Sequence, residues 1–292
     1  MMRLLVLSAF LVFASAATIP ELATQLGCTE LVKLVEHAGL AEVLSREGPF
    51  TVFAPTNDAF AKLPKAVLED LMRNRQLLSE VLKYHLVYGS LYSSELTNEM
   101  TEASLAPLAN IRFNIYNTGN LITAEGSPVE KANQNASNGV IHVVNRVLFP
   151  IPFLDIPQLI VRERARFSIL LDAVVKANIV AVLSGGPFTL FAPTNDAFAK
   201  IPADALKTLF DNITALTDVL NYHVISGTFW SSSLSDGMTP KTVEGKTVKI
   251  TINGGGKVSV NNANVEEADD AVTNGVIHVI DTVLLPPSFH IN

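Results

Sequence analysis

One ten-residue segment occurs twice in this chain without a single change. Residues 53–62, FAPTNDAFAK, recur as residues 191–200, at an offset of 138 residues. Shorter matches follow in the same order: Tyr84-His85 with Tyr222-His223, and NGVIHV at 138–143 with the same letters at 274–279. Solenoid proteins repeat with periods of about 20–50 residues. A period near 138 in a chain of 292 residues therefore predicts two domains of one fold.

The repeated segments carry a resemblance to a known family. FAPTNDAFAKLP, then a Tyr-His pair, then NGVIHVVNRVLFP resemble the ordered motifs of the fasciclin domain, and the second half repeats them with few changes. The resemblance implies an α+β fold for each half, a β-wedge of two sheets with an edge layer of helices. It also implies the matrix and adhesion type of fasciclin protein, that of periostin and the transforming-growth-factor-β-induced protein, whose domains bind without known catalysis.

Composition sets the expected ends of the two units. Residues 1–17 have the basic start, the apolar run and the small residues of a cleaved secretory signal peptide. We expect the first fasciclin-like domain over residues 18–150 and the second over residues 158–288. The connector between them, residues 151–157, is rich in proline, which predicts a stiff link rather than a flexible tether.

The charge and the remaining apolar runs bear on location. The formal net charge is −7, and there is no run of basic residues to match nucleic acid or an anionic membrane. No later apolar run approaches the length of about 20 residues that spans a membrane, and the C-terminus lacks a lipid-anchor signal. We therefore expect a secreted, extracellular protein with no transmembrane or lipid anchor. Two glycosylation sequons fit that compartment: Asn135 in an expected turn, and Asn212 beside an expected helix.

Each unit should contain a buried strand that turns sharply into a helix. Residues 50–54 form an apolar run after Gly-Pro, and residues 188–192 repeat it. The next residues, Thr56, Asn57 and Asp58, are of the kinds that cap helices. We expect the rings of Phe53 and Phe60 to be buried on either side of this turn.

Apolar spacing predicts helices before the turn and a covered strand at the end of each unit. One helix is expected over residues 29–44, with Thr29 as its N-cap, and its counterpart over residues 168–183. Residues 140–149 and 276–285 are apolar on both faces, so they predict a central strand that is covered on both sides.

No group of residues in the sequence has the pattern of a catalytic, cofactor or metal site. Four histidines occupy repeat positions: His85, His142, His223 and His278. They either form metal-binding pairs or are buried, neutral and bonded to the backbone, and their apolar neighbours favour the second interpretation. No ligand cluster or catalytic motif accompanies them, so we expect neither an enzyme nor a cofactor.

Two further features allow alternatives. Cys28 is the single cysteine, so it is either a buried thiol or the point of an intermolecular disulfide. The acidic residues Glu266, Glu267, Asp269 and Asp270 either bind calcium or form a solvated loop, and the loop is the favoured interpretation.

The resemblance also implies partners. Tyr84, His85, Tyr222 and His223 match a family motif proposed to contact integrins, although the residues alone favour a place in the core. A second proposed receptor motif, an Asp-Ile pair, is replaced by Asn133-Gln134 and Asp269-Asp270. The expected function is that of a secreted matrix or adhesion protein that binds matrix proteins or a cell-surface receptor, with integrins as one candidate. The alternative is a secreted carrier of an apolar small molecule, a lipid or a carotenoid, as in some algal fasciclin proteins.

Overall fold

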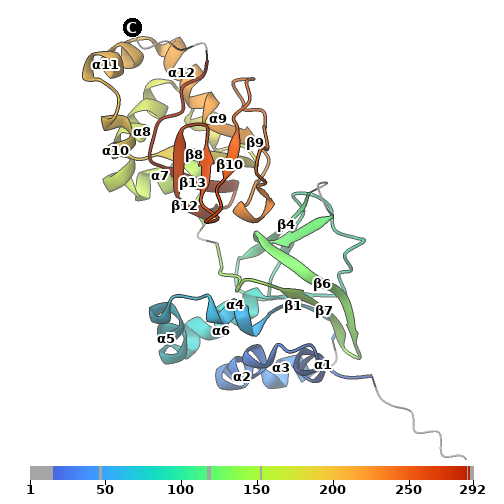
Figure 1. The fold of residues 1–292 in the computed structure, drawn as a ribbon. Coiled ribbons are helices and arrows are strands. Elements are labelled where there is room, and N and C mark those ends of the chain that lie inside the picture. The colour runs from blue at the N-terminus through green and yellow to red at the C-terminus, as the bar shows by residue number, and fades with distance from the viewer. Residues whose placement is uncertain (1–15, 46–47, 117–119, 152, 288, 290–292) are drawn as a thin grey trace, which may run out of the picture.

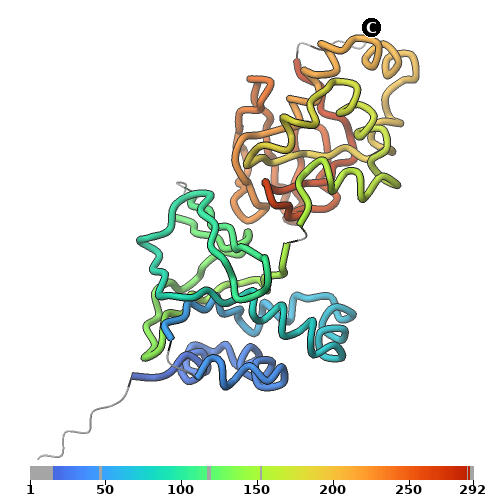
Figure 2. The backbone as a smooth tube through the Cα atoms, turned by 180° about the vertical axis from the view of Figure 1, so that it is seen from behind, coloured from blue at the N-terminus to red at the C-terminus, as the bar shows by residue number. Residues whose placement is uncertain are grey.

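The two repeats form two domains that lie end to end and are joined by one crossing of the chain (Figures 1 and 2). The structure is a computed structural model that describes residues 16–45, 48–116, 120–151, 153–287 and 289. The expected signal peptide therefore lies, except for its last two residues, outside the described part. Within the described ranges, no helix is both long and apolar enough to cross a membrane.

The helices of the first domain form a layer on one side of its strands (Figure 1). They are α1 (Ile19–Gln25), α2 (Thr29–Ala38), α3 (Ala41–Ser45), α4 (Asn57–Ala61), α5 (Lys65–Arg73) and α6 (Arg75–Tyr84). The single helix expected over residues 29–44 is in fact two, because Gly39 adopts the left-handed conformation (φ 74°) and ends α2. The N-cap position of α2 is Cys28, so the prediction of Thr29 was wrong by one residue.

The strands of the first domain form a wedge. They are β1 (Phe50–Pro55), β2 (Leu86–Tyr88), β3 (Thr101–Ala103), β4 (Asn110–Tyr116), β5 (Leu121–Ala124), β6 (Ser127–Ala136) and β7 (Gly139–Val144), in the order β2-β1-β7-β6-β5-β4-β3. Strand β6 pairs with β5 at its start and with β7 beyond, and two register shifts interrupt its pairing with β7. Such bulges bend a strand, so β6 belongs to both leaves. Strand β7 is central and buried as predicted, but it ends at Val144 instead of continuing to Phe149.

The second domain repeats this arrangement. Its helices are α7 (Ile156–Arg162), α8 (Arg164–Lys176), α9 (Val180–Leu183), α10 (Asn195–Ala199), α11 (Ala203–Asp211), α12 (Ile213–Tyr222) and the 3₁₀ helix η1 (Ser231–Ser233). Its strands are β8 (Phe188–Pro193), β9 (Val224–Ser226), β10 (Ile250–Ile252), β11 (Val258–Val260), β12 (Ala263–Val272) and β13 (Gly275–Ile280), in the order β10-β11-β12-β13-β8-β9. Helix α7 starts at Ile156, which is fully buried, so the last residues of the expected connector are part of this domain's core.

The strand-to-helix turn has the predicted construction. The Thr56 hydroxyl accepts a hydrogen bond from the backbone N–H of Ala59 at 3.1 Å, which caps α4. Thr194 caps α10 in the same way at 3.2 Å. Phe53 and Phe60 are both buried, as expected. The turn therefore holds the sheet and the helical layer together in each domain.

The repeated Asn-Gly pair joins the first helix of each domain to its central strand. The Asn274 side chain accepts a hydrogen bond from the Ile156 N–H (2.9 Å) and donates to the carbonyl of Leu183 (2.7 Å). Asn138 makes the equivalent bonds in the first domain, to Ile19 and Leu44. Glycine follows because a Cβ at Gly275 would lie 1.8 Å from the Phe188 carbonyl oxygen.

We predict that Asn274→Ala lowers the free energy of unfolding by about 1–3 kcal/mol, because it leaves backbone groups of α7 and α9 without their partner. Urea unfolding followed by circular dichroism measures this change. Asn221→Ala, at a half-buried position of α12, is the control and should cost much less. Equal midpoints for the two variants would contradict the role given to Asn274.

Candidate functional site

The two histidines of the Tyr-His motif are buried and bonded through both ring nitrogens. His85 donates from Nδ1 to the Val81 carbonyl at 2.8 Å, and its Nε2 accepts from the Leu148 N–H at 2.9 Å. His223 makes the same pair of bonds, to Val219 at 2.7 Å and Leu284 at 2.9 Å. Burial lowers the pKa of each imidazole to about 4, so both are neutral at pH 7. With both nitrogens occupied, neither ring is available as a base or as a metal ligand.

The tyrosines of the motif are equally enclosed. Tyr84 is 0% exposed and Tyr222 is 2% exposed. The Tyr84 hydroxyl donates to the Asn110 carbonyl at 2.8 Å, and the Tyr222 hydroxyl donates to the Thr247 carbonyl at 2.9 Å. Each motif therefore joins the end of a helix to the strands of the wedge, and none of its four side chains faces solvent in this structure.

The other repeated histidines hold a loop in each domain. His278 donates from Nε2 to the Phe229 carbonyl at 2.8 Å, while its Nδ1 accepts from the Asp269 N–H at 3.3 Å. His142 makes the equivalent bonds to Leu91 and Asn133. Burial lowers the pKa of both rings. Within the described ranges, no group of three or more His, Cys, Asp or Glu side chains could hold a metal ion.

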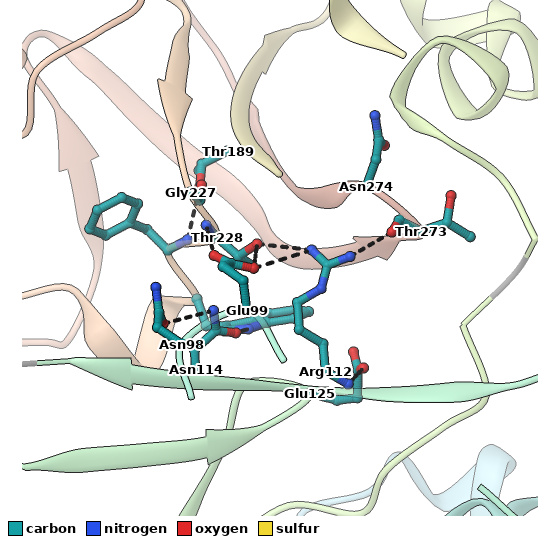
Figure 3. A network of polar contacts seen from close by, with 12 residues as sticks. Asn98, Glu99, Arg112, Asn114, Glu125, Thr189, Gly227, Thr228, Thr273 and Asn274 are labelled. Carbon is teal, nitrogen blue, oxygen red and sulfur yellow. Dashed lines mark hydrogen bonds and ion pairs between the residues drawn. The ribbon is translucent and has the colours of Figure 1, made fainter. Parts of the chain in front are cut away.

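The loop held by His278 is the part of the second domain that docks on the first. We call residues 228–232 the docking segment. Its first residue, Thr228, contacts Arg112 and Glu99 of the first domain (Figure 3). Arg112 is only 7% exposed, and its guanidinium donates to the Thr228 hydroxyl at 2.9 Å and to the Thr273 carbonyl at 2.5 Å. The Glu99 carboxylate lies 3.8 Å from this guanidinium and accepts from the Thr228 N–H at 2.7 Å. A buried cation thus has partners from both domains.

The single tryptophan fills the centre of the same interface. Trp230 is 2% exposed and donates its indole N–H to the Asn114 side chain at 2.9 Å. Its ring lies against Gly126, where an added Cβ would be 2.6 Å from a ring carbon. The Tyr116 hydroxyl also donates to the Thr228 carbonyl at 2.6 Å. The docking segment therefore binds a specific surface formed by β4 and the β5–β6 turn.

The acidic residues near position 269 are not a solvated loop. They lie in strand β12; the carboxylates of Glu267, Asp269 and Asp270 are paired, whereas Glu266 is exposed. Asp269 accepts from Arg146 of the first domain at 2.6 Å. Burial opposes ionisation of this carboxyl, but His278, Ser231 and Arg146 together keep its pKa below the usual range. Glu267 and Asp270 pair with Arg166 at 2.7 and 3.2 Å. The position at which Asp269-Asp270 replace the family's proposed Asp-Ile receptor motif is thus partly a domain contact.

The remaining predicted residues occupy simpler places. Cys28 is a free thiol that is 0% exposed, so the intermolecular disulfide does not fit this structure. Asn135 and Asn212 are both exposed. Asn135 lies in strand β6 and not in the expected turn, whereas Asn212 caps α12 by accepting from the Ala215 N–H at 3.1 Å.

Sequence reasoning missed the interface residues, although a weak signal was present. Arg112 and Asn114 alternate with the apolar residues of β4, which is typical of a strand with one solvated face. Here that polar face is covered by the other domain. Only the pairing with residues more than 110 positions away distinguishes the two cases.

Comparison with known proteins assigns both halves of the chain to one family. The Fasciclin domain model matches residues 26–150 and 165–286. The chain is 35% identical to transforming growth factor-beta-induced protein ig-h3 of Sus scrofa over 246 residues, which are 83% of this chain and 36% of that protein. It is 33% identical to Homo sapiens periostin over 264 residues, 90% of this chain and 31% of periostin. The chain thus spans about a third of the length of these relatives.

One solved structure is also similar. It is a FAS1 domain pair from the insect cell adhesion molecule Fasciclin I, with 20% identity and a TM-score of 0.44. The match covers 90% of this chain and 98% of that one.

We predict that acid removes the contribution of the buried histidines to the stability of both domains, because the histidine pKa values are lower in the folded chain than in the unfolded chain. The unfolded chain then binds more protons below about pH 6.5, so stability is lost as the pH falls from 6.5 towards 4. The loss expected from His85 and from His223 is on the order of 2–3 kcal/mol each, measured by urea unfolding at pH 7.5 and pH 4.5. Glu125 acts in the opposite sense, since burial raises its pKa to about 7 and its contribution is present at low pH. Glu125→Gln should therefore show a larger acid loss, and a flat profile would contradict the assignment.

We predict that Gly126→Ala separates the domains without unfolding them, because the new methyl group collides with the Trp230 ring. Fluorescence of this single tryptophan should shift to longer wavelength as the indole meets water. Gly237→Ala is the matched control, since Gly237 has a similar φ of 78° against 71° but no atom within 4 Å of an added Cβ. A spectrum that is the same for both variants would refute this packing.

Proposed function

This chain belongs to the fasciclin family, and on that premise we propose that it is a secreted protein of the extracellular matrix or of cell adhesion that acts by binding and not by catalysis. The buried histidines support a non-catalytic role, because both ring nitrogens of His85 and of His223 are already hydrogen-bonded to the backbone. Its partners would be matrix proteins or a cell-surface receptor, with integrins as one candidate.

The observation that carries the proposal is the fixed docking of the two domains. The buried Arg112, the Trp230 indole and the Arg146–Asp269 pair all cross the interface. They orient two binding modules on one chain. Two weak sites held at a constant separation bind a surface more tightly than either alone, because the second contact forms at a high effective concentration.

We propose that the Tyr-His motifs serve this function through the core. Tyr84, His85, Tyr222 and His223 are buried, so a receptor could contact them only after local unfolding. Receptor contacts would then come from exposed side chains. Secretion and glycans at Asn135 and Asn212 belong to the same proposal, and the exposure of both asparagines is compatible with it.

The carrier alternative has less support. An apolar cavity in the first domain has a volume of about 170 Å³. Pockets that enclose drug-sized ligands typically measure about 300–1,000 Å³. The cavity is therefore too small to enclose a lipid or a carotenoid.

The deciding experiment is attachment of cells to a surface coated with the protein, with and without divalent cations. We expect attachment, and we expect Gly126→Ala to reduce it several-fold relative to Gly237→Ala, because the first variant releases the fixed geometry. Absence of attachment to folded protein would count against adhesion.

The same assay tests the role of the motif. His85→Ala should lower the melting temperature of the first domain by about 10 °C, because it leaves the buried Leu148 N–H without a partner. Loss of attachment with an unchanged melting temperature would instead identify His85 as a receptor contact.

A further inference from the structure

The first domain contains an apolar cavity beneath its N-terminal helices. It lies between α1, α2 and α3 on one side and β1 and α6 on the other, and its walls include Ala23, Leu31, Val35, Leu44, Val52 and Leu82. These six side chains are all buried. The exposed residues Glu36 and Ser45 also line it, so the cavity reaches the surface near the ends of α2 and α3.

We propose that this cavity is a binding site for a neutral, apolar molecule of about the size of one aromatic ring. The cavity volume of about 170 Å³ limits the ligand to this size. A dry cavity of roughly 150 Å³ lined by Leu, Ile and Phe binds benzene or xenon, whereas water enters only where it finds two or more polar partners. The site goes beyond the proposed adhesion function and does not depend on it.

The polar groups at the cavity explain why the ligand must be neutral. His85 is part of the wall, but its two nitrogens are bonded to Val81 and Leu148. The Ser45 hydroxyl donates to the Ala41 carbonyl at 2.8 Å. Neither group offers a free bond to a ligand, and the Glu36 carboxylate at the mouth repels anions. An acid would therefore lose its hydration without compensation.

Comparison with the second domain explains the cavity in the first. Helices α1 and α7 both begin with Ile-Pro after a capping box, which aligns Ala23 with Ile160. The start of α3 likewise aligns Ala41 with Val180, and the repeated strand aligns Val52 with Leu190. At each of these positions the second domain has the larger side chain. The first domain therefore has less side-chain volume on both sides of this space, and the cavity is the result.

The test is titration of benzene into the full chain, followed by NMR of the Leu, Val and Ile methyl groups. We expect one saturable site, with shifts at Leu31, Leu44 and Leu82. Benzoate should bind at least tenfold more weakly than benzene. Ala23→Ile, which copies the second domain, should weaken benzene binding at least tenfold while the protein stays folded.

The reciprocal change makes the test specific. Ile160→Ala should create a second benzene site in the second domain, with new shifts there and unchanged shifts in the first. If Ala23→Ile does not fold, Ala41→Val narrows the same cavity by a smaller step and should weaken binding measurably. The proposal is overturned if the original chain shows no saturable shifts, or if the filled variants bind benzene with unchanged affinity.

Discussion

The burial of one positive charge governs how the two domains sit together. The Arg112 guanidinium is removed from water, and a desolvated charge is tolerated only when it is paired and hydrogen-bonded. The first domain supplies Glu99, and the second domain supplies the Thr228 hydroxyl and the Thr273 carbonyl. Separation of the domains would remove both partners that the second domain supplies to this guanidinium. The interface is thus polar around Arg112, and its geometry there follows from the directions of these bonds.

Residues that are identical in the two halves serve a common architecture. The histidines, the capping threonines and the Asn-Gly pairs make the same backbone bonds in both domains. Residues that differ give each half its individual role. Trp230 and Asp269 make the second domain the one that docks, whereas Ala23 gives the first domain its cavity.

The fold was largely predictable because its signals are local or repeated. Caps, breakers and apolar periodicity located the strand–turn–helix unit, and the resemblance supplied the wedge. The expected helix is divided at Gly39. The apolar spacing continues across this residue, but its backbone has a left-handed conformation that ends the helix. The interface was not predictable for a different reason. Arg112, Asn114 and Asp269 look like solvated strand residues until a partner more than 110 residues away covers them. Tyr84 and His85 are buried, as their apolar neighbours in the sequence indicated. The family motif alone would have suggested a receptor contact at the surface.

The docking is head to tail, and such heterologous contacts can in principle add units without end. Both unused surfaces exist in this chain: Tyr92 stands where the second domain has Trp230, and Thr251 and Asn262 stand where the first has Asn114 and Gly126. These exchanges remove the indole, its amide acceptor and the open space that admits the ring. The same sequence differences therefore fix the order of the pair: the first domain carries the accepting surface and the second carries the docking segment.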